Sequence, residues 1–496
     1  MKIASSKPRA LLLGVLVVTG VGALLAADKT FSDPAPPETH EPAEGPAPEA
    51  EKYPSTTFHR APKPLPEGAK TEDWPRFLGP RRNLVSAETK LLAAFPAEGP
   101  PLVWEAATGR GYSSPSIVGD RLVYLHRVGN QERVECLQPE TGRRYWSFAY
   151  ATKYRDRYGY GDGPRASPII DGDRVYTYGA QGMLHCLRLR DGAELWRRNI
   201  TEEFKVPQDF FGSAATPLIE GDRLVLGVGA PGGPTVAAFN KNSGEMLWGA
   251  GEEWGPSYAS AVAADVAGRR RVLVFAGGES RPPTGGLLSI NPRNGAVDFA
   301  FPWRSRTYES VNAATPVVVD DDVLISATYR TGAAMLRLLP DGGYRELWTS
   351  SDFDLHWTTP IHDDGYFYGF AGRNEPDASL MCINAKTGET VWSEVLEWEE
   401  EATIGGRLRT IPASPGRGFL MQVDGRFLAL GEHGHLLWLQ LSPEGPRILS
   451  RARLFLARQT WSPPVISRGL LYVSQNTNAF DSGAKPRLLC YDLRAD

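Results

Sequence analysis

The candidates for chemistry in this sequence are few, and the first is a pair of histidines, His433 and His435, separated by one glycine. Imidazole is a common metal ligand, so two histidines this close could share an ion. The pair lies in a short polar stretch between two apolar runs, which is typical of a hairpin turn. The Gly-x-Ser-x-Gly pattern of a nucleophilic serine is absent from the sequence, although a Ser/His/Asp set gathered from distant segments stays open. We therefore expect no metal site and no catalytic residue.

Three short acidic stretches, at residues 171–173, 220–222 and 320–322, resemble calcium loops in composition. They lack the spaced series of oxygen ligands and the terminal glutamate of an EF-hand loop. Hairpin turns favour the same residue types, Asp and Gly. The Gly/Pro-rich stretch 230–234 follows a strand-like run but opens no helix, so it is not a phosphate-binding loop. Neither feature predicts a cofactor, and we expect none.

Aromatic side chains beside arginine, histidine or aspartate recur in the stretches that separate the strand-like runs. Trp, Tyr and Arg are the residues that dominate the energetics of protein interfaces. We therefore expect a partner-binding face. It consists of Tyr154, Arg155, Tyr158, Trp254, Arg306, Tyr308, His356, Trp357 and Trp461. The alternative is that these rings pack inside the fold and that the charges are only solvated.

The elements that position these stretches follow from an internal repeat, which opens with a proline and closes with a tryptophan. Five copies pair Pro115 with Trp146, Pro168 with Trp196, Pro217 with Trp248, Pro316 with Trp348 and Pro360 with Trp392, always 28 to 32 residues apart. The last copy begins at Pro464 and has no closing tryptophan, whereas Trp104 precedes the first copy. Because a ring must pair its first strand with its last blade, we predict that residues 101–105 complete the last copy.

Two longer gaps between opening prolines each hide a degenerate copy, at residues 260–303 and 418–455, so the copies number eight. Each copy holds four short strand-like runs separated by Gly/Asp turns, which is the organisation of one propeller blade. No stretch from residue 100 onward shows helical periodicity over three turns. We predict an all-β fold: an eight-bladed β-propeller of four-stranded antiparallel blades, closed by an N-terminal strand that completes the last blade.

The four cysteines, Cys136, Cys186, Cys382 and Cys490, all fall on the third strand of a copy. Third strands of neighbouring blades lie too far apart for a disulfide bond. We expect four buried thiols with a packing role.

The first hundred residues differ from the repeats in composition. Residues 1–27 combine basic residues with an apolar run and predict a signal peptide or signal anchor. Residues 28–71, rich in Pro, Ala and Glu, predict a disordered linker, and 72–100 a leader segment that packs on the propeller at 101–496. The protein is thus expected to be exported, either periplasmic or membrane-anchored and facing the periplasm. A net charge of −4 without a basic cluster argues against a nucleic-acid partner.

The repeat resembles the family of pyrroloquinoline-quinone-type repeat β-propellers. The motifs that carry the resemblance are residues 114–124 and 134–146 of the first copy and counterparts such as 380–392, and the resemblance covers residues 101–496. The segment 73–83 also resembles a leader that precedes such propellers. The family includes quinoprotein dehydrogenases as well as the non-catalytic B subunit of the β-barrel outer-membrane assembly machinery, so the resemblance implies a fold rather than one function.

Two functions follow from this resemblance. A dehydrogenase of the family implies a quinone clamped between a tryptophan and a disulfide of consecutive cysteines, with Ca²⁺ held by Glu, Asn and Asp, and this sequence has no consecutive cysteines. We therefore expect a non-catalytic, monomeric propeller that acts as a protein- or glycan-binding scaffold at the cell envelope, similar to the assembly-machinery B subunit. The alternative is a periplasmic pyrroloquinoline quinone-dependent dehydrogenase.

Overall fold

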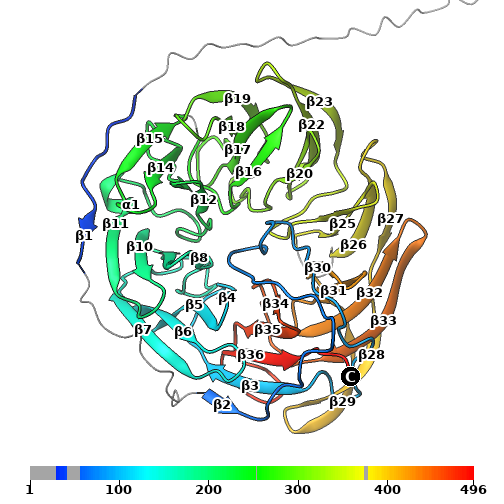
Figure 1. The fold of residues 1–496 in the computed structure, drawn as a ribbon. Coiled ribbons are helices and arrows are strands. Elements are labelled where there is room, and N and C mark those ends of the chain that lie inside the picture. The colour runs from blue at the N-terminus through cyan, green and yellow to red at the C-terminus, as the bar shows by residue number, and fades with distance from the viewer. Residues whose placement is uncertain (1–29, 42–55, 253, 374–377) are drawn as a thin grey trace, which may run out of the picture.

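The computed structural model describes residues 30–41, 56–252, 254–373 and 378–496, in which almost all regular structure is β-strand. Eight antiparallel blades stand around a central axis (Figure 1), which confirms the predicted eight-bladed propeller. Blade 1 is β4 (Ser116–Val118), β5 (Arg121–Val128), β6 (Gln131–Leu137) and β7 (Arg144–Ala151); blade 2 is β8 (Ile169–Asp171), β9 (Arg174–Tyr178), β10 (Met183–Arg188) and β11 (Glu194–Asn199). Blade 3 is β12 (Leu218–Glu220), β13 (Arg223–Gly227), β14 (Val236–Asn240) and β15 (Met246–Ala250); blade 4 is β16 (Val262–Val266), β17 (Arg269–Ala276), β18 (Gly286–Ile290) and β19 (Val297–Pro302).

The remaining blades repeat the same order, from the innermost strand outward. Blade 5 is β20 (Val317–Val319), β21 (Asp322–Ala327), β22 (Gly332–Leu338) and β23 (Tyr344–Ser350); blade 6 is β24 (Ile361–Asp363), β25 (Tyr366–Ala371), β26 (Ser379–Asn384) and β27 (Thr390–Glu394). Blade 7 is β30 (Phe419–Val423), β31 (Arg426–Leu430), β32 (His435–Ser442) and β33 (Gly445–Arg453); blade 8 is β34 (Val465–Ser467), β35 (Leu470–Gln475), β36 (Arg487–Asp492) and β3 (Leu102–Ala107). One short helix, α1 (Ile200–Glu203), follows blade 2 within the described ranges.

The tryptophan that closes each regular copy docks on the next blade. Trp146 of blade 1 donates its indole N–H to the carbonyl oxygen of Leu189 at 2.8 Å, and its ring lies against Gly192 in the last turn of blade 2. A Cβ on Gly192 would come within 2.4 Å of the ring, and its φ of +72° also favours glycine. The tryptophans of four further blades, Trp104, Trp196, Trp248 and Trp348, lie on Gly142, Gly244, Gly295 and Gly388. This contact explains the fixed spacing of Gly and Trp in the repeat.

The ring closes where the sequence predicts. β3 pairs antiparallel with β36, and Trp104 lies opposite Cys490. The Trp104 indole is fully buried and donates to the carbonyl oxygen of Pro139 in blade 1 at 2.7 Å. The first strand of the propeller therefore completes the last blade. All four cysteines are free and buried, each opposite a docking tryptophan on the adjacent strand.

The two degenerate copies form complete blades with other residues at the docking position. In blade 4 the position is taken by Phe299, which packs on Tyr344 of blade 5 with ring centroids 4.7 Å apart, while Trp303 lies beyond the end of β19. In blade 7 the equivalent residue is Ser450. A separate hairpin of β28 (Trp398–Ile404) and β29 (Arg407–Ala413) precedes blade 7 and adds to the long gap before Pro464, most of which is filled by blades 6 and 7.

Parts of the segment expected to be a linker lie on the outer edges of blades (Figure 1). β1 (Glu38–Thr39) pairs with β11, and β2 (Thr56–Phe58) pairs with β3. Asp33 binds both terminal nitrogens of the buried Arg198. Composition did not indicate these contacts, because each depends on an edge formed by distant residues. Residues 1–27, predicted to be a signal peptide or signal anchor, and residues 42–55 lie outside the described residues. No helix in the described ranges has the length and apolarity needed to cross a membrane.

The leader segment crosses the axis of the ring. Trp74 exchanges backbone hydrogen bonds with Ile117 of β4, and the carbonyl oxygen of Pro75 accepts from Ile170 of β8. Further along, Val85 bridges to Gln422 of β30, on the innermost strand of blade 7. The leader therefore passes from blades 1 and 2 to blade 7 across the centre of the molecule (Figure 1).

Candidate binding site in the central cavity

A cavity of about 1390 Å³ occupies the centre of the ring. Its walls come from the connections between blades and from turns on the same face, and Phe77 of the leader lines it from the axis. The side chains used below are Tyr112, Tyr160, Arg165, Phe211, Tyr258, His356, Trp357, Arg373, Arg417, Glu432, Arg458, Gln459 and Trp461. Because the leader crosses the axis, we read the cavity as a blind pocket rather than a through-channel.

The repeat itself places one side chain per blade in this wall. The residue three places before each of the six opening prolines lines the cavity: Tyr112, Arg165, Ala214, Ala313, Trp357 and Trp461. The equivalent residue of the degenerate fourth copy, Tyr258, lines it as well. The chain at this point has just left one blade and turns into the innermost strand of the next, so the side chain faces the axis. Aromatic or basic residues therefore precede blades 1, 2, 4, 6 and 8, whereas blades 3 and 5 contribute alanine.

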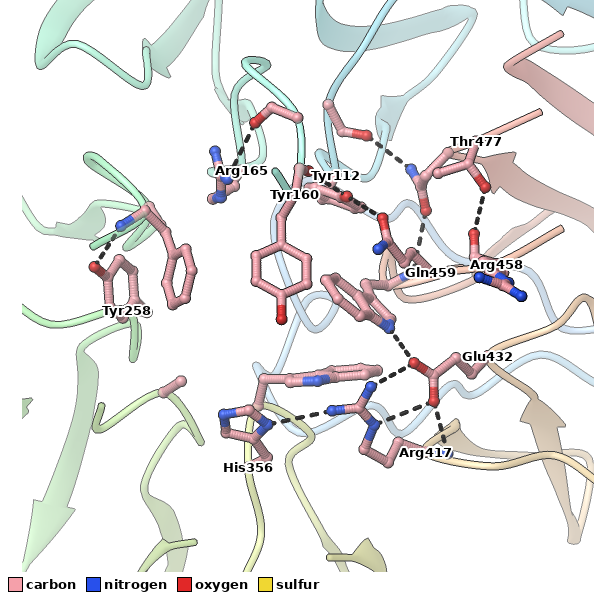
Figure 2. A pocket seen from close by; sticks show the side chains of 18 of the residues that line it. Tyr112, Tyr160, Arg165, Tyr258, His356, Arg417, Glu432, Arg458, Gln459 and Thr477 are labelled. Atoms are coloured by element: carbon pink, nitrogen blue, oxygen red, sulfur yellow. Dashed lines mark hydrogen bonds and ion pairs between the residues drawn. The ribbon is translucent and has the colours of Figure 1, made fainter. Parts of the chain in front are cut away.

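A continuous row of aromatic rings follows the wall (Figure 2). Trp461 lies at its centre, with ring centroids 5.4 Å from both Tyr112 and Tyr160 and 6.0 Å from Trp357. Tyr160 continues to Phe211 at 5.7 Å. Large partly exposed rings grouped in one hollow are costly to leave in water, and such surfaces mark binding sites.

The polar side chains next to this row are held by one another. Arg417 binds Glu432 through two nitrogens, at 2.5 and 3.1 Å, and Trp461 donates its indole N–H to the same carboxylate at 2.7 Å. The other side of the Arg417 guanidinium lies 3.5 Å from Nδ1 of His356 (Figure 2). Burial, followed by the charges of Arg417 and Arg373, lowers the pKa of His356 to about 3. His356 is therefore a neutral imidazole in this wall. Both side-chain oxygens of Glu432 already accept hydrogen bonds, from Arg417 and Trp461.

A second charged group fixes the loop between blades 1 and 2. Arg165 pairs with Asp156 at 2.8 Å, and the other carboxylate oxygen of Asp156 accepts the backbone N–H groups of Tyr158 and Tyr160. Tyr112 donates its hydroxyl hydrogen to Gln459 at 2.9 Å, and burial raises the pKa of this hydroxyl. The loop that carries Tyr160 is thus preorganised by ion pairing rather than by packing alone.

Of the nine residues expected in the binding face, His356, Trp357 and Trp461 line the cavity. Tyr158 is 45% exposed and lies edge-on to Phe210 and Phe211 beside it.

Four of the others are on the surrounding surface or beneath it. Arg155 is largely exposed and donates to Asn130, and Arg306 is exposed. Tyr308 hydrogen-bonds to Glu279 under the guanidinium of Arg281. Tyr154 is buried against Arg165.

Trp254 packs in the apolar cluster between blades 3 and 4. For Tyr154 and Trp254 the structure matches the alternative interpretation, in which rings between blades serve packing.

The interpretation from sequence missed Arg417 and Glu432, which belong to the degenerate seventh copy and meet only in the folded turn. It also passed over Tyr112 and Arg165. Their shared position before an opening proline is the signal that could have identified both.

The residues of the cavity do not fit a quinone held in the manner that the family resemblance implies. The cysteines lie on β6, β10, β26 and β36, within blades, and none belongs to the cavity wall. Within the described ranges no three His, Cys, Asp or Glu side chains are grouped as metal ligands. The acidic side chains of the wall, Asp156, Asp162 and Glu432, are each paired with an arginine. The described part of the wall therefore offers neither the disulfide nor a free carboxylate set for Ca²⁺.

Comparison with known proteins agrees with this fold. Residues 130–394 and 345–495 match the family described as outer membrane protein assembly factor BamB. Among solved structures, BamB from Moraxella catarrhalis has a TM-score of 0.50 at 17% identity, covering 77% of this chain and 95% of its own. A europium-containing methanol dehydrogenase has a TM-score of 0.60 at 10% identity, covering 86% and 98%.

The quinohemoprotein alcohol dehydrogenase from Comamonas testosteroni has a TM-score of 0.56 at 12% identity, covering 86% of this chain and 81% of its own. No curated protein sequence matches the chain. At these identities the structural likeness shows the fold alone, whereas the family match extends over most of the propeller. The chain belongs to the pyrroloquinoline-quinone-type repeat β-propeller family, in the group that the BamB model describes.

Proposed function

We propose that this protein is a non-catalytic propeller of the cell envelope, exported to the periplasm or anchored to the membrane on that side, and that it binds a protein or glycan partner. The face that binds is the one formed by the inter-blade connections, with the central cavity at its middle. The match to the BamB family supports an envelope scaffold, although the assembly role itself belongs to particular relatives.

The observation that carries this proposal is the state of the polar groups around the aromatic row. Glu432 is saturated by Arg417 and Trp461, and His356 is neutral beside Arg417. General acid–base chemistry needs a group whose pKa lies near the working pH and which can reach the substrate. These groups instead hold the tryptophans in place, which suits recognition of a ligand by preformed surfaces.

Capture of a partner from envelope extracts tests the proposal. The variant R155A/R306A/W357A changes the proposed face, and the matched control D120A/D173A/D222A changes exposed turn residues of the opposite face. We expect the first variant to weaken capture by well over tenfold, since single anchors of this kind often contribute 2 kcal/mol or more, with the melting temperature nearly unchanged. Equal loss in the turn variant would place the site on the other face.

Absorbance of the purified protein, titrated with pyrroloquinoline quinone and Ca²⁺, tests the non-catalytic part. A saturable, stoichiometric spectral shift accompanied by dye reduction would overturn it.

A further inference from the structure

The described part of the cavity wall holds more basic than acidic side chains. Among the wall residues that the structure describes, five arginines, Arg110, Arg165, Arg373, Arg417 and Arg458, face three carboxylates. Each carboxylate already has an arginine partner: Asp156 pairs with Arg165 at 2.8 Å, Asp162 with Arg110 at 3.2 Å and Glu432 with Arg417 at 2.5 Å. The described part of the wall therefore carries an excess of two positive charges in a chain whose net charge is −4.

The two arginines that remain are Arg373 and Arg458. Both are exposed, and neither has a carboxylate within ion-pair distance among the residues that the structure describes. The guanidinium of Arg373 lies 4.3 Å from the centre of the Tyr329 ring and hydrogen-bonds to that side chain, so its partner there is a neutral phenol rather than a carboxylate. The backbone carbonyl oxygen of Arg458 accepts a hydrogen bond from the hydroxyl of Thr477, and this bond does not involve the guanidinium. Two such groups at one hollow attract an anion, because a guanidinium binds carboxylate or sulfate oxygens in a bidentate manner.

The aromatic groups indicate what carries that anion. The indole N–H of Trp461 is already donated to Glu432, so the ring face is what Trp461 offers to a ligand. Trp357 lies 6.0 Å from Trp461 and adjoins the same hollow. The apolar C–H face of a sugar ring stacks on such planes, while the hydroxyl groups around its edge match polar side chains such as Gln459 and Asn478 in the same wall.

An extended peptide fits this wall less well. Peptides that bind β-proteins commonly add a strand to an unpaired sheet edge. The cavity wall consists mostly of connections and turns rather than of a free strand edge. Neighbouring connections bond to each other, as in the hydrogen bond from Tyr112 N–H to the carbonyl oxygen of Pro164 at 2.8 Å. At about 1390 Å³ the cavity also exceeds the roughly 300–1,000 Å³ typical of small-molecule pockets, so an oligomer suits it better than a single sugar.

We propose that the central cavity binds an acidic oligosaccharide, with sugar rings on Trp357 and Trp461 and its carboxylate or sulfate groups on Arg373 and Arg458. This inference rests on the proposed binding function and names the ligand class of the same site.

The test titrates the full-length protein with three oligosaccharides of equal length: an oligogalacturonate, a chondroitin sulfate fragment and a neutral malto-oligosaccharide. A fourth titration uses a poly-glutamate peptide of the same charge. We expect one or both acidic sugars to bind, the neutral sugar and the peptide to bind at least tenfold more weakly, and added salt to weaken the acidic ligand. Because chondroitin sulfate carries carboxylates as well as sulfates, binding of this fragment without binding of oligogalacturonate shows that sulfate is required, and equal binding of both shows that carboxylate suffices.

The variant R458Q removes one exposed charge without touching the packed network, and R293Q removes an exposed arginine from a turn on the opposite face as its matched control. We expect R458Q to weaken the acidic sugar about tenfold, as the loss of one charged hydrogen bond does, and R293Q to leave it unchanged. Equal binding of the neutral sugar, tighter binding of the peptide, or no effect of R458Q overturns the inference. If no sugar binds while the R155A/R306A/W357A variant still loses an envelope protein, the inference falls and the proposed function stands.

Discussion

Closure of the ring depends on the contact between Trp104 and Gly142, and a double-mutant cycle on these two residues measures it. Trp104 is fully buried at the junction of blades 8 and 1. A Cβ on Gly142 would lie 2.9 Å from Cδ2 of Trp104, and the φ of Gly142 is +67°. The two variants W104A and G142A therefore disturb one interface from opposite sides.

The expected magnitudes follow from the structure. A buried tryptophan removes roughly 150–250 Å² from water, which at about 25 cal/mol per Å² sets an upper limit of about 4–6 kcal/mol. Truncation to alanine commonly costs about 3–5 kcal/mol, so we expect W104A to lower the free energy of unfolding by about 4 kcal/mol. In G142A the left-handed backbone costs about 1 kcal/mol and the clash about 1–3 kcal/mol more. When the indole is absent, the backbone cost remains and so does a close contact of the new Cβ with Cγ2 of Thr56 at 2.8 Å, so only the part of the clash that involves Trp104 disappears.

The double variant W104A/G142A should thus lose about 1–2 kcal/mol less than the sum of the single losses, measured by chemical denaturation followed through tryptophan fluorescence. The control pairs W104A with G192A, because Gly192 faces Trp146 at the next junction. That pair should be additive within about 0.5 kcal/mol. Additive losses for Trp104 and Gly142, or equal coupling in the control, would refute closure through this contact.

Two further predictions concern burial of charge and the N-terminal segment. Burial raises the pKa of Asp209 from 3.8 to about 6, so the native state holds an extra proton between these values and this group costs stability as the pH rises from 4 to 6. The variant D209N keeps an acceptor for the N–H of Glu279. Its free energy of unfolding relative to that of the parent should rise by up to about 3 kcal/mol between pH 4 and 7, measured by thermal melts. A stability difference between variant and parent that stays constant over this pH range would contradict the assignment. Asp33 anchors residues 30–41 to the propeller through its ion pair with Arg198. D33A should therefore speed cleavage at Glu38 by a glutamate-specific protease at least several-fold. A cleavage rate equal to that of the parent would show that the pairing of β1 with β11 alone holds the segment.

The number of blades and the ring closure could be predicted from sequence because one local contact repeats. Each docking indole needs a glycine at a fixed place in the next blade, so Trp146 and Gly192 leave a spacing that is visible without any structure. Phe299 and Ser450 break that pattern, yet their blades form, since neighbouring blades impose the same four strands. The architecture can therefore be predicted even though two copies lack the docking tryptophan, because the other copies repeat the same contact.

The candidate site could be predicted only in part, because no repeated contact marks which aromatic side chains face the cavity. His356, Trp357 and Trp461 stand in aromatic stretches between strands and line the cavity. Trp254 stands in a similar stretch but packs between blades. Composition does not separate the two cases, because the direction of each side chain depends on how many residues lie between it and the next innermost strand.

The leader connects fold and function in this molecule. A ring of eight blades leaves a hole on its axis, and a hole open at both ends would let water contact a ligand from both sides. Here the leader spans that hole, with backbone hydrogen bonds to blades 1, 2 and 7, and places Phe77 in the wall of the cavity. A pocket closed at one end buries more of its ligand and keeps the aromatic row on one accessible side, which raises the share of binding energy that each ring contributes. The segment before the first blade therefore belongs to the proposed binding site as much as to the fold.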